Sequence, residues 1–224
     1  MMEQVAQPAT PPQIALSVER APEPHFGYDF AKRSLDILFA ATMLVLLLPV
    51  FAVIALVILV TSGRPIFFSQ KRLGLGGEEF DCLKFRTMVP DAEARRAQVL
   101  SLNTTGGPAF KHPDDPRLTS IGRFLRKTSL DELPQFLNIL IGNMSLVGPR
   151  PLPVYENQYV GDQSRRLSVK PGLTCSWQIS GRSGITFDRW MEMDVEYVET
   201  RTVLKDLNIL LRTPLAVITA RGAM

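Results

Sequence analysis

Two adjacent carboxylates precede a proline in segment 129–134, which reads SLDELP. Its Ser-x-x-Glu spacing matches a capping box, in which Ser129 would start a helix. Pro134 opposes that interpretation, because it would then fall about five positions into the helix, where its missing N–H matters. A helix that starts near Pro134 would instead place Asp131 and Glu132 just ahead of its N-terminus, where anions are favoured and phosphate can bind. There Asp131 could act as a nucleophile, and Glu132 as a proton carrier or metal ligand.

Basic side chains beside rigid turns are the second set of candidates, because arginine binds phosphate through two parallel hydrogen bonds. Arg150 lies between two prolines in GPRP (148–151), which would fix its backbone direction. Arg182, in the glycine-containing loop 180–184, could present its side chain and nearby amides to an anion. The remaining candidates are Lys84, Arg86, Arg117 and Arg126. The alternative for each is a solvated surface charge.

The residue counts exclude several other kinds of site. Two cysteines and two histidines among 224 residues are too few for a disulfide framework or a four-ligand zinc site. The net charge of +3 is far from that of a dedicated nucleic-acid binder, so no nucleic-acid partner is expected. A hydrophobic fraction of 46% with 21% charged residues is typical of a globular chain.

Much of the apolar content lies in residues 37–60, which carry no charge. A straight helix of this length would be about 36 Å long, enough to span a bilayer. A signal peptide would start earlier and have a shorter apolar core, and a buried core helix would usually keep a polar face. The block therefore predicts insertion into a lipid bilayer.

Pro49, near the middle of this block, predicts a break or a kink in the membrane helix. A kinked helix that spans the bilayer is one possibility, because membranes tolerate such prolines. The other is a re-entrant helix–break–helix with both ends on the cytoplasmic side, which basic residues prefer. Basic residues flank the block at both ends and favour the re-entrant form: Lys32, Arg33, Arg64, Lys71 and Arg72.

The remaining segments predict a mainly α fold with a small β-hairpin. Residues 66–72 and 78–86 are strand-like and enclose a glycine-rich turn. Residues 91–102 resemble a polar helix, and residues 103–116 a loop. Residues 118–127 have a basic amphipathic pattern, which suits either a membrane surface or packing on the chain's own domain. Residues 187–212 show helical periodicity, and the apolar stretch 207–218 could serve a homodimer.

Three regions are therefore expected. Residues 1–24 are proline-rich and predict a disordered tail. Residues 30–62 form the membrane-inserted segment, and residues 63–224 a cytoplasmic catalytic domain with amphipathic helices at the membrane surface. This is the organisation of a monotopic membrane protein.

Five motifs in order resemble the bacterial sugar transferase family, the monotopic phosphoglycosyl transferases. They are KFRTM (84–88), DPR (115–117), LRKTSLDELPQ (125–135), MSLVGPRP (144–151) and KPGLT (170–174). The resemblance extends from about Lys32 to the C-terminus. The run WQISGR (177–182) and the pair Asp206-Leu207 look most like members that start exopolysaccharide synthesis with galactose or glucose.

The resemblance implies an enzyme at the cytoplasmic face of the bacterial inner membrane. Such enzymes transfer a sugar 1-phosphate from a UDP-sugar to a polyprenyl (undecaprenyl) phosphate, release UMP and need Mg²⁺. Asp131 would form a phosphosugar–aspartyl intermediate, with Glu132 assisting the metal or the acceptor phosphate, so that both are metal-ligand candidates. The family pattern assigns phosphate neutralisation to Arg150, Lys84, Arg86, Arg117 and Arg126. The family's re-entrant helix breaks at a Ser-Pro pair, where this chain has Leu48-Pro49.

Two other hypotheses remain open at the sequence level. One is a non-catalytic membrane-anchored scaffold that recruits polysaccharide machinery through its basic face. The other is a transferase with a different nucleotide donor. The sequence does not choose among galactose, glucose and an amino sugar.

Overall fold

The computed structural model describes residues 27–99, 115–156, 159, 161–181 and 184–219. The expected tail over 1–24, most of the expected loop over 103–116, and Arg182 lie outside these residues.

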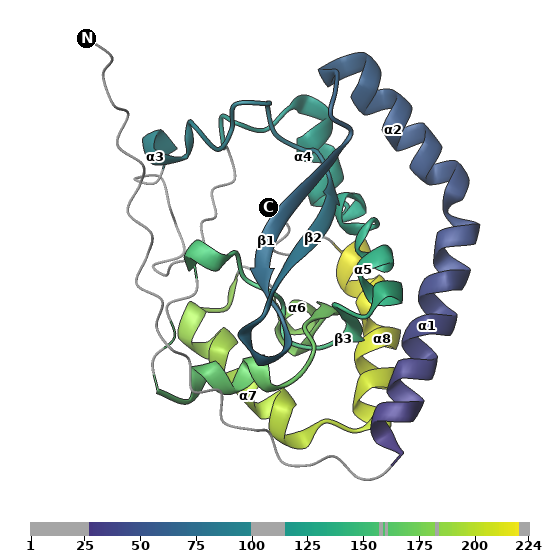
Figure 1. Ribbon diagram of the computed structural model, residues 1–224, viewed down its shortest axis with the longest axis vertical. Coiled ribbons are helices and arrows are strands. Elements are labelled where there is room, and N and C mark those ends of the chain that lie inside the picture. Colours follow the sequence, from purple (N-terminus) through teal and green to yellow (C-terminus); the bar gives the residue numbers. More distant parts are fainter. Residues whose placement is uncertain (1–26, 100–114, 157–158, 160, 182–183, 220–224) are drawn as a thin grey trace.

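Helices α1 (Tyr28–Leu46) and α2 (Leu48–Ser62) run along one edge of the molecule (Figure 1). They meet at Leu47 with a bend of 59°. Pro49 lies in the first turn of α2, where a proline is tolerated because its missing N–H would have no partner within that helix. The predicted break beside Pro49 is confirmed.

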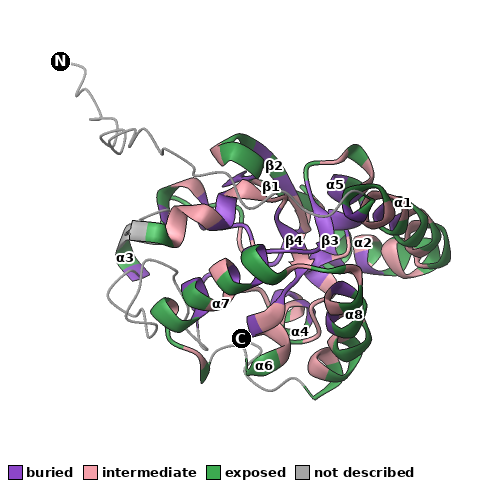
Figure 2. Cartoon of the chain, turned by 90° about the horizontal axis from the view of Figure 1, so that it is seen from below, coloured by how far each residue is buried: buried purple, intermediate pink, exposed green. Residues whose placement is uncertain are grey.

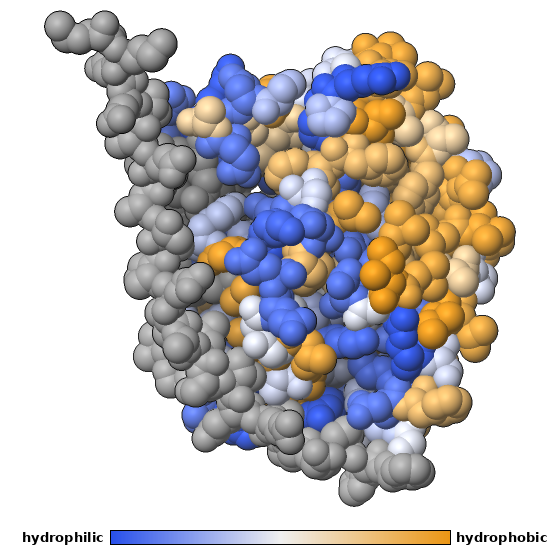
Figure 3. All heavy atoms as spheres, viewed as in Figure 1, coloured by the Kyte–Doolittle hydropathy of each residue, from blue (hydrophilic) through white to orange (hydrophobic). Residues whose placement is uncertain are grey.

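The outer face of this bent pair is a continuous apolar surface. Eight large apolar side chains of the pair are more than 60% exposed: Phe30, Leu38, Val45, Leu46, Leu48, Val53, Leu56 and Val60. Figure 3 shows the hydrophobic atoms gathered along this edge. Within the described residues, neither helix alone has the length and apolar composition to cross a bilayer, whereas the bent pair has both. An exposed apolar surface of this extent fits contact with lipid.

The predicted hairpin is confirmed as β1 (Phe67–Leu73) and β2 (Glu79–Phe85), paired antiparallel from Phe67↔Phe85 to Leu73↔Glu79. The outer edge of β2 is bound by a side chain of α5 (Gln135–Ile141). Asn138 accepts a hydrogen bond from Leu83 N (3.0 Å) and donates one to Asp81 O (2.7 Å). This buried amide holds the end of β2, and hence Lys84, beside the start of α5.

A parallel pair of short strands, β3 (Ser145–Val147) and β4 (Gly172–Thr174), was not predicted. Strands of three residues are too short to show a periodicity in the sequence. The pairing continues past β3, because Gly148 N donates to Thr174 O and Gly172 N to Pro149 O. It brings motif 144–151 alongside motif 170–174.

Gly172→Ala is expected to destabilise the protein by about 1–3 kcal/mol or more, as overpacking does. A Cβ at Gly172 would meet the backbone of Gly148 and Val147, which cannot move aside as a flexible side chain would. Denaturant unfolding measures the effect. Gly184→Ala is the matched control, since a Cβ there meets nothing within 4 Å. Equal stabilities for the two variants would contradict this account of the strand contact.

The helical predictions are partly confirmed. The basic amphipathic segment forms α4 (Ser120–Lys127). The helix expected over 91–102 is wrong for residues 91–95, which form turns, and the described helix there is only α3 (Arg96–Val99). This short, mostly polar segment, in which Ala92 and Val99 are buried, gains too little from packing to offset the cost of helix nucleation.

In the described residues after β4 the chain forms α6 (Ser176–Ser180), α7 (Phe187–Thr200) and α8 (Val203–Ile218). The helical region expected over 187–212 is thus divided after α7. Arg201 is extended, and Thr202 caps α8 by accepting a hydrogen bond from Lys205 N (3.1 Å). The face of α8 that bears Leu204, Leu211, Leu215 and Ile218 is exposed, so a homodimer through this stretch stays a prediction.

The main core lies where α1, β2, α5, β3, α7 and α8 meet. Its buried residues include Ala40, Phe80, Phe136, Leu146 and Ile209. Figure 2 shows buried residues where β3 and β4 lie near α1 and α5, and exposed residues along the outer side of α8. A second cluster surrounds the indoles of Trp177 and Trp190, whose ring centroids are 4.3 Å apart. These cores fix the elements that carry the charged motifs.

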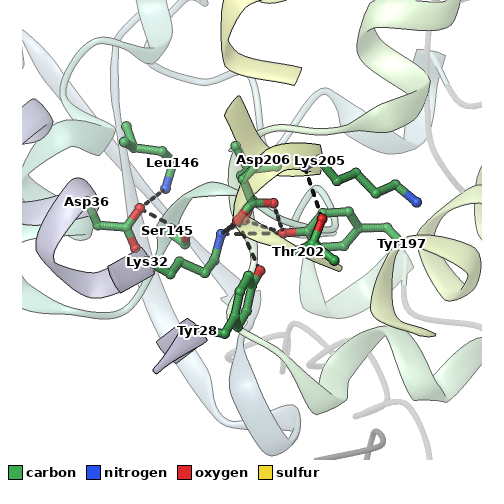
Figure 4. A network of polar contacts seen from close by, with 10 residues as sticks. Tyr28, Lys32, Asp36, Ser145, Leu146, Tyr197, Thr202, Lys205 and Asp206 are labelled. Atoms are coloured by element: carbon green, nitrogen blue, oxygen red, sulfur yellow. Dashed lines mark hydrogen bonds and ion pairs between the residues drawn. The ribbon is translucent and has the colours of Figure 1, made fainter. Parts of the chain in front are cut away.

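The start of α1 is fastened to the domain by buried polar contacts (Figure 4). Lys32 Nζ donates to Asp206 Oδ2 (2.7 Å) and to Val147 O (2.8 Å). Tyr197 OH also donates to Asp206 (2.7 Å), and Asp36 accepts hydrogen bonds from Ser145 Oγ and Leu146 N. These contacts join α1 to both α8 and β3.

The basic side chains that flank the apolar block are therefore not simply solvated charges. Lys32 forms a mostly buried ion pair. Arg33 donates to the carbonyls of Ile139 and Leu140 near the end of α5. Arg72 is also buried. Because these three side chains have partners within the domain, their charge is weaker support for a topology than the sequence pattern alone indicated.

Candidate active site

Asp131 and Glu132 lie in a single 3₁₀ turn, Leu130–Glu132, just before α5. The helix begins after Pro134, as one of the two interpretations of this segment predicts. The capping-box interpretation is wrong, because the Ser129 side chain makes no capping hydrogen bond and its φ is +58°. Both carboxylates are almost completely buried.

Glu132 is held by two cations from different parts of the fold. Lys84 Nζ, at the end of β2, donates to Oε1 (2.9 Å). Arg150, in the loop after β3, donates from Nη1 to Oε2 (3.1 Å) and from Nη2 to Oε1, so that the pair is bidentate. Burial alone would raise the pKa of Glu132, but Arg150 and Lys84 outweigh it and hold that pKa well below its usual range. Glu132 is therefore an ionised anchor for both cations.

Asp131 has a different environment from its neighbour. Within the described part of the chain, the cation within ion-pair distance is Lys84, with Nζ 3.8 Å from Oδ2, and no hydrogen bond to the Asp131 carboxyl forms. Burial raises the pKa of Asp131, and the charge of Glu132 raises it further against the opposing effect of Lys84. Adjacent carboxyls with pKa values shifted in opposite directions are typical of sites that give two acids different roles. In the described residues the oxygens of Asp131 therefore keep lone pairs that no hydrogen bond occupies.

The other predicted phosphate-binding residues are placed differently. Burial lowers the pKa of Arg126, and the charges of Asp131 and Glu132 oppose that lowering, which places Arg126 near the pair. Its Nε donates to Thr87 Oγ1 (3.1 Å). Arg117 is paired in a bidentate contact with Asp115, with Nη2 2.7 Å from Oδ2. Arg86 donates to the carbonyls of Ser62 and Gly63 at the end of α2.

The structure thus brings Lys84 and Arg150 to the carboxylate pair, with Arg126 nearby. Arg86 and Arg117 are already engaged by other groups, and Arg182 lies outside the described residues. Binding of phosphate by any of the six residues stays a prediction.

Two buried residues that the sequence analysis did not select, Arg166 and Asp194, are connected to the backbone of Arg150. Arg166 donates from Nη2 to Arg150 O and to Asp194 Oδ2 (2.8 Å). In the sequence Arg166 looks like any arginine of a polar stretch. Asp194 carried a usable signal, since it shares the buried face of α7 with Trp190, Met191 and Val198, and an acid on such a face usually has a buried partner.

Comparison with known proteins identifies the family. A family model described as bacterial sugar transferase matches residues 27–220. The chain is 46% identical over 200 residues to galactosyl transferase CpsE of Streptococcus agalactiae, and 40% identical over 200 residues to undecaprenyl-phosphate galactose phosphotransferase of Salmonella typhimurium. It is 39% identical over 198 residues to exopolysaccharide production protein ExoY of Sinorhizobium fredii.

The lengths of these relatives differ. The match covers 88% of this chain but 44% of CpsE, and 87% of this chain but 42% of the Salmonella protein. It covers 86% of this chain and 88% of ExoY. The chain therefore spans less than half of the two longer relatives, and most of the shorter one.

Proposed function

The chain belongs to the bacterial sugar transferase family, and we propose that it transfers a hexose 1-phosphate from a UDP-sugar to a polyprenyl phosphate of the undecaprenyl type, with release of UMP. The observation that carries this proposal is the buried Asp131–Glu132 pair. One carboxylate is neutralised by Lys84 and Arg150, and the other is left without a hydrogen bond in the described part of the chain. The name of the Salmonella relative includes the same class of acceptor.

In the proposed reaction Asp131 acts as a nucleophile. A carboxylate oxygen attacks the phosphorus that bears the sugar, an O–P bond forms, and the bond to UMP breaks, with the electron pair leaving on the UMP oxygen. An oxygen of the polyprenyl phosphate then attacks the same phosphorus, and the bond to Asp131 breaks. The carboxylate is regenerated, and neither step requires a net proton transfer. The product of the two steps would be a polyprenyl diphosphate sugar.

The surrounding cations supply charge stabilisation, which dominates catalysis of phosphoryl transfer. Lys84 and Arg150 are preorganised by Glu132, so their positions do not depend on the substrate. Their remaining N–H groups would bind the phosphate oxygens beside Asp131. Arg126, which interacts electrostatically with Asp131, would add positive potential near that carboxylate.

Magnesium is part of the proposal. Within the described residues no cluster of three or more metal-ligating side chains occurs, so the protein would offer a carboxylate pair rather than a closed cage. Mg²⁺ commonly binds one or two carboxylates together with substrate phosphates and water. Asp131 has oxygens without a hydrogen bond in the described residues, whereas Glu132 would share with the metal an oxygen that already accepts from Lys84 or Arg150. When bound, the ion would neutralise charge on the diphosphate of the donor.

A membrane location is proposed from the outer surface of α1 and α2. The acceptor is a lipid, and its phosphate would lie at the level of the headgroups. Arg86 directly follows β2, the strand that brings Lys84 to the site, and its side chain donates to Gly63 O at the end of α2. It therefore links the site to the end of the bent pair. We place the catalytic domain at the cytoplasmic face of the bacterial inner membrane, with the bent pair entering and leaving on that face.

Acceptor-free UMP release tests the proposed reaction most directly. Purified protein in a lipid nanodisc with Mg²⁺ and each of a panel of UDP-sugars should release about one UMP per enzyme with a suitable sugar, because the aspartyl intermediate cannot turn over. Adding polyprenyl phosphate should then give continuous release. If a nucleoside monophosphate were released only from a nucleotide sugar other than a UDP-sugar, the proposed donor would be wrong and that nucleotide sugar would take its place. No release from any donor, with or without acceptor, would favour the scaffold hypothesis.

A further inference from the structure

The backbone carbonyls of the loop that carries Arg150 accept hydrogen bonds from several other parts of the fold. Lys32 Nζ donates to Val147 O, and Gly172 N donates to Pro149 O. Further along, Leu73 N donates to Leu152 O (3.4 Å). Between these points lie the carbonyls of Arg150 and Pro151, and each accepts a hydrogen bond from a buried arginine side chain.

Arg166 binds the first of these two carbonyls. Its Nη2 donates to Arg150 O, and its Nε and Nη2 donate to Asp194 Oδ2 at 3.1 and 2.8 Å. Its Nη1 donates to Tyr159 OH (2.9 Å). The side chains of Arg166 and Asp194 are each 1% exposed. Arg72 binds the second carbonyl, from Nη1 to Pro151 O, and is itself 8% exposed.

These contacts restrict where the Arg150 side chain can point. The loop contains three prolines, at 149, 151 and 153, which have no N–H to pair with a neighbouring strand. At these three positions the backbone can be held through a carbonyl but not through an N–H. A guanidinium suits this task, because its planar set of donors can bind a carbonyl and a carboxylate at once.

We propose that Arg166, held by Asp194, is a positioning residue that fixes the backbone of Arg150 so that its guanidinium is aligned on Glu132 beside Asp131. Arg166 itself does not touch the reacting atoms; it acts through Arg150. The consequence for sugar-phosphate transfer rests on the proposed function, whereas the backbone contact can be tested without it.

The first test is hydrogen exchange of Arg166→Lys. Lysine keeps the charge that Asp194 requires but cannot donate in the same plane to both the carboxylate and Arg150 O. Faster exchange is expected in a peptide covering 145–156, with exchange of α4 and α5 unchanged. Arg189→Lys, an exposed arginine of α7 paired with Glu192, is the matched control and should leave that peptide unchanged.

The second test is transfer activity. Arg166→Lys is expected to lower kcat/KM about 100-fold, the usual size of an effect of misplacement by roughly 1 Å. An Arg150→Lys variant retains the charge and is expected to keep measurable turnover. In that background the same change should cost less than about 3-fold, because residues that act through one another are not additive. If Arg166→Lys still lowered kcat/KM about 100-fold in the Arg150→Lys background, Arg166 would not act through Arg150, and the proposal would be overturned.

The outcomes separate the two proposals. Unchanged exchange over 145–156 overturns the positioning role, and so does exchange that rises equally across the whole domain. Faster local exchange with unaltered transfer overturns its part in catalysis. If Arg166→Lys fails to fold, Tyr159→Phe, which removes one partner of Arg166, should give a smaller increase at the same peptide, and no increase would overturn the role. A wild type without activity on any nucleotide sugar overturns the proposed function, while the exchange result still decides the role of Arg166.

Discussion

Replacing Asp131 with asparagine is expected to lower sugar-phosphate transfer at least about 1,000-fold, the scale on which loss of a covalent nucleophile acts. Asparagine has nearly the same shape but no anionic oxygen to attack phosphorus. The burst of UMP without acceptor should disappear together with steady turnover. Binding to lipid vesicles should be unchanged, because Asp131 is buried away from the apolar face of α1 and α2.

The same variant has a second expected effect, on stability. The pKa of Asp131 is raised in the folded state, so its contribution to stability is present below the ordinary pKa of aspartate and is lost as pH rises through the raised value. The asparagine side chain of the variant stays neutral and loses nothing. The variant should therefore match the wild type in acid and become the more stable protein as pH rises toward neutrality, a trade of stability for activity.

Unfolding curves in detergent at several pH values measure this difference. Asp81→Asn is the matched control, since Asp81 is exposed and Lys71 lowers its pKa. Its stability change should have the opposite sign or be absent. Near-normal transfer by Asp131→Asn would show that Asp131 is not the nucleophile. A lower stability of that variant than of the wild type at neutral pH would contradict the raised pKa of Asp131.

Replacing Lys32 with methionine is expected to destabilise the fold by about 3–5 kcal/mol, the cost of leaving one member of a buried ion pair alone. Lys32 is 16% exposed in its side chain and Asp206 6%. Without the ammonium, Asp206 keeps the phenols of Tyr28 and Tyr197 (3.0 and 2.7 Å) but no counter-charge. Val147 O also loses a donor.

Thermal and denaturant unfolding in detergent measure this loss. The double variant Lys32→Met/Asp206→Asn should recover part of it, because no buried charge is then left unpaired. Lys71→Met is the control, since Lys71 and Asp81 form an exposed pair (57% and 59% exposed side chains), and such pairs contribute little. Equal stability of the Lys32 and Lys71 variants would show that the buried network does not hold α1 to the domain.

Local patterns were enough for much of the fold and part of the site. The length of the apolar block and Pro49 predict two helices with a break, and the glycine-rich turn predicts the hairpin, because these signals act within a few residues of one another. Pro134 likewise identifies where α5 begins. The position of Asp131 and Glu132 ahead of that helix follows from the same local rule.

Tertiary structure decided the partners of each charge. Lys84, Arg86, Arg117 and Arg150 are chemically alike in the sequence, yet only the first and last lie against Glu132. Their destinations depend on pairings between distant segments, such as Asn138 with β2 and β3 with β4. The different pKa directions of Asp131 and Glu132 arise from the same contacts.

The hairpin, the two helices of the apolar block with their break, the start of α5 and the family resemblance follow from the sequence, because periodicity, proline positions and ordered motifs are properties of neighbouring residues. The short strands β3 and β4 and the division between α7 and α8 do not. Only the tertiary structure decided that Lys32 lies in a buried ion pair, and that Arg166 binds the backbone of Arg150. The physical reason is that the energy of a charge depends on its burial and on its counter-charge. Both are set by residues that are up to 174 positions away in the chain, as for Lys32 and Asp206.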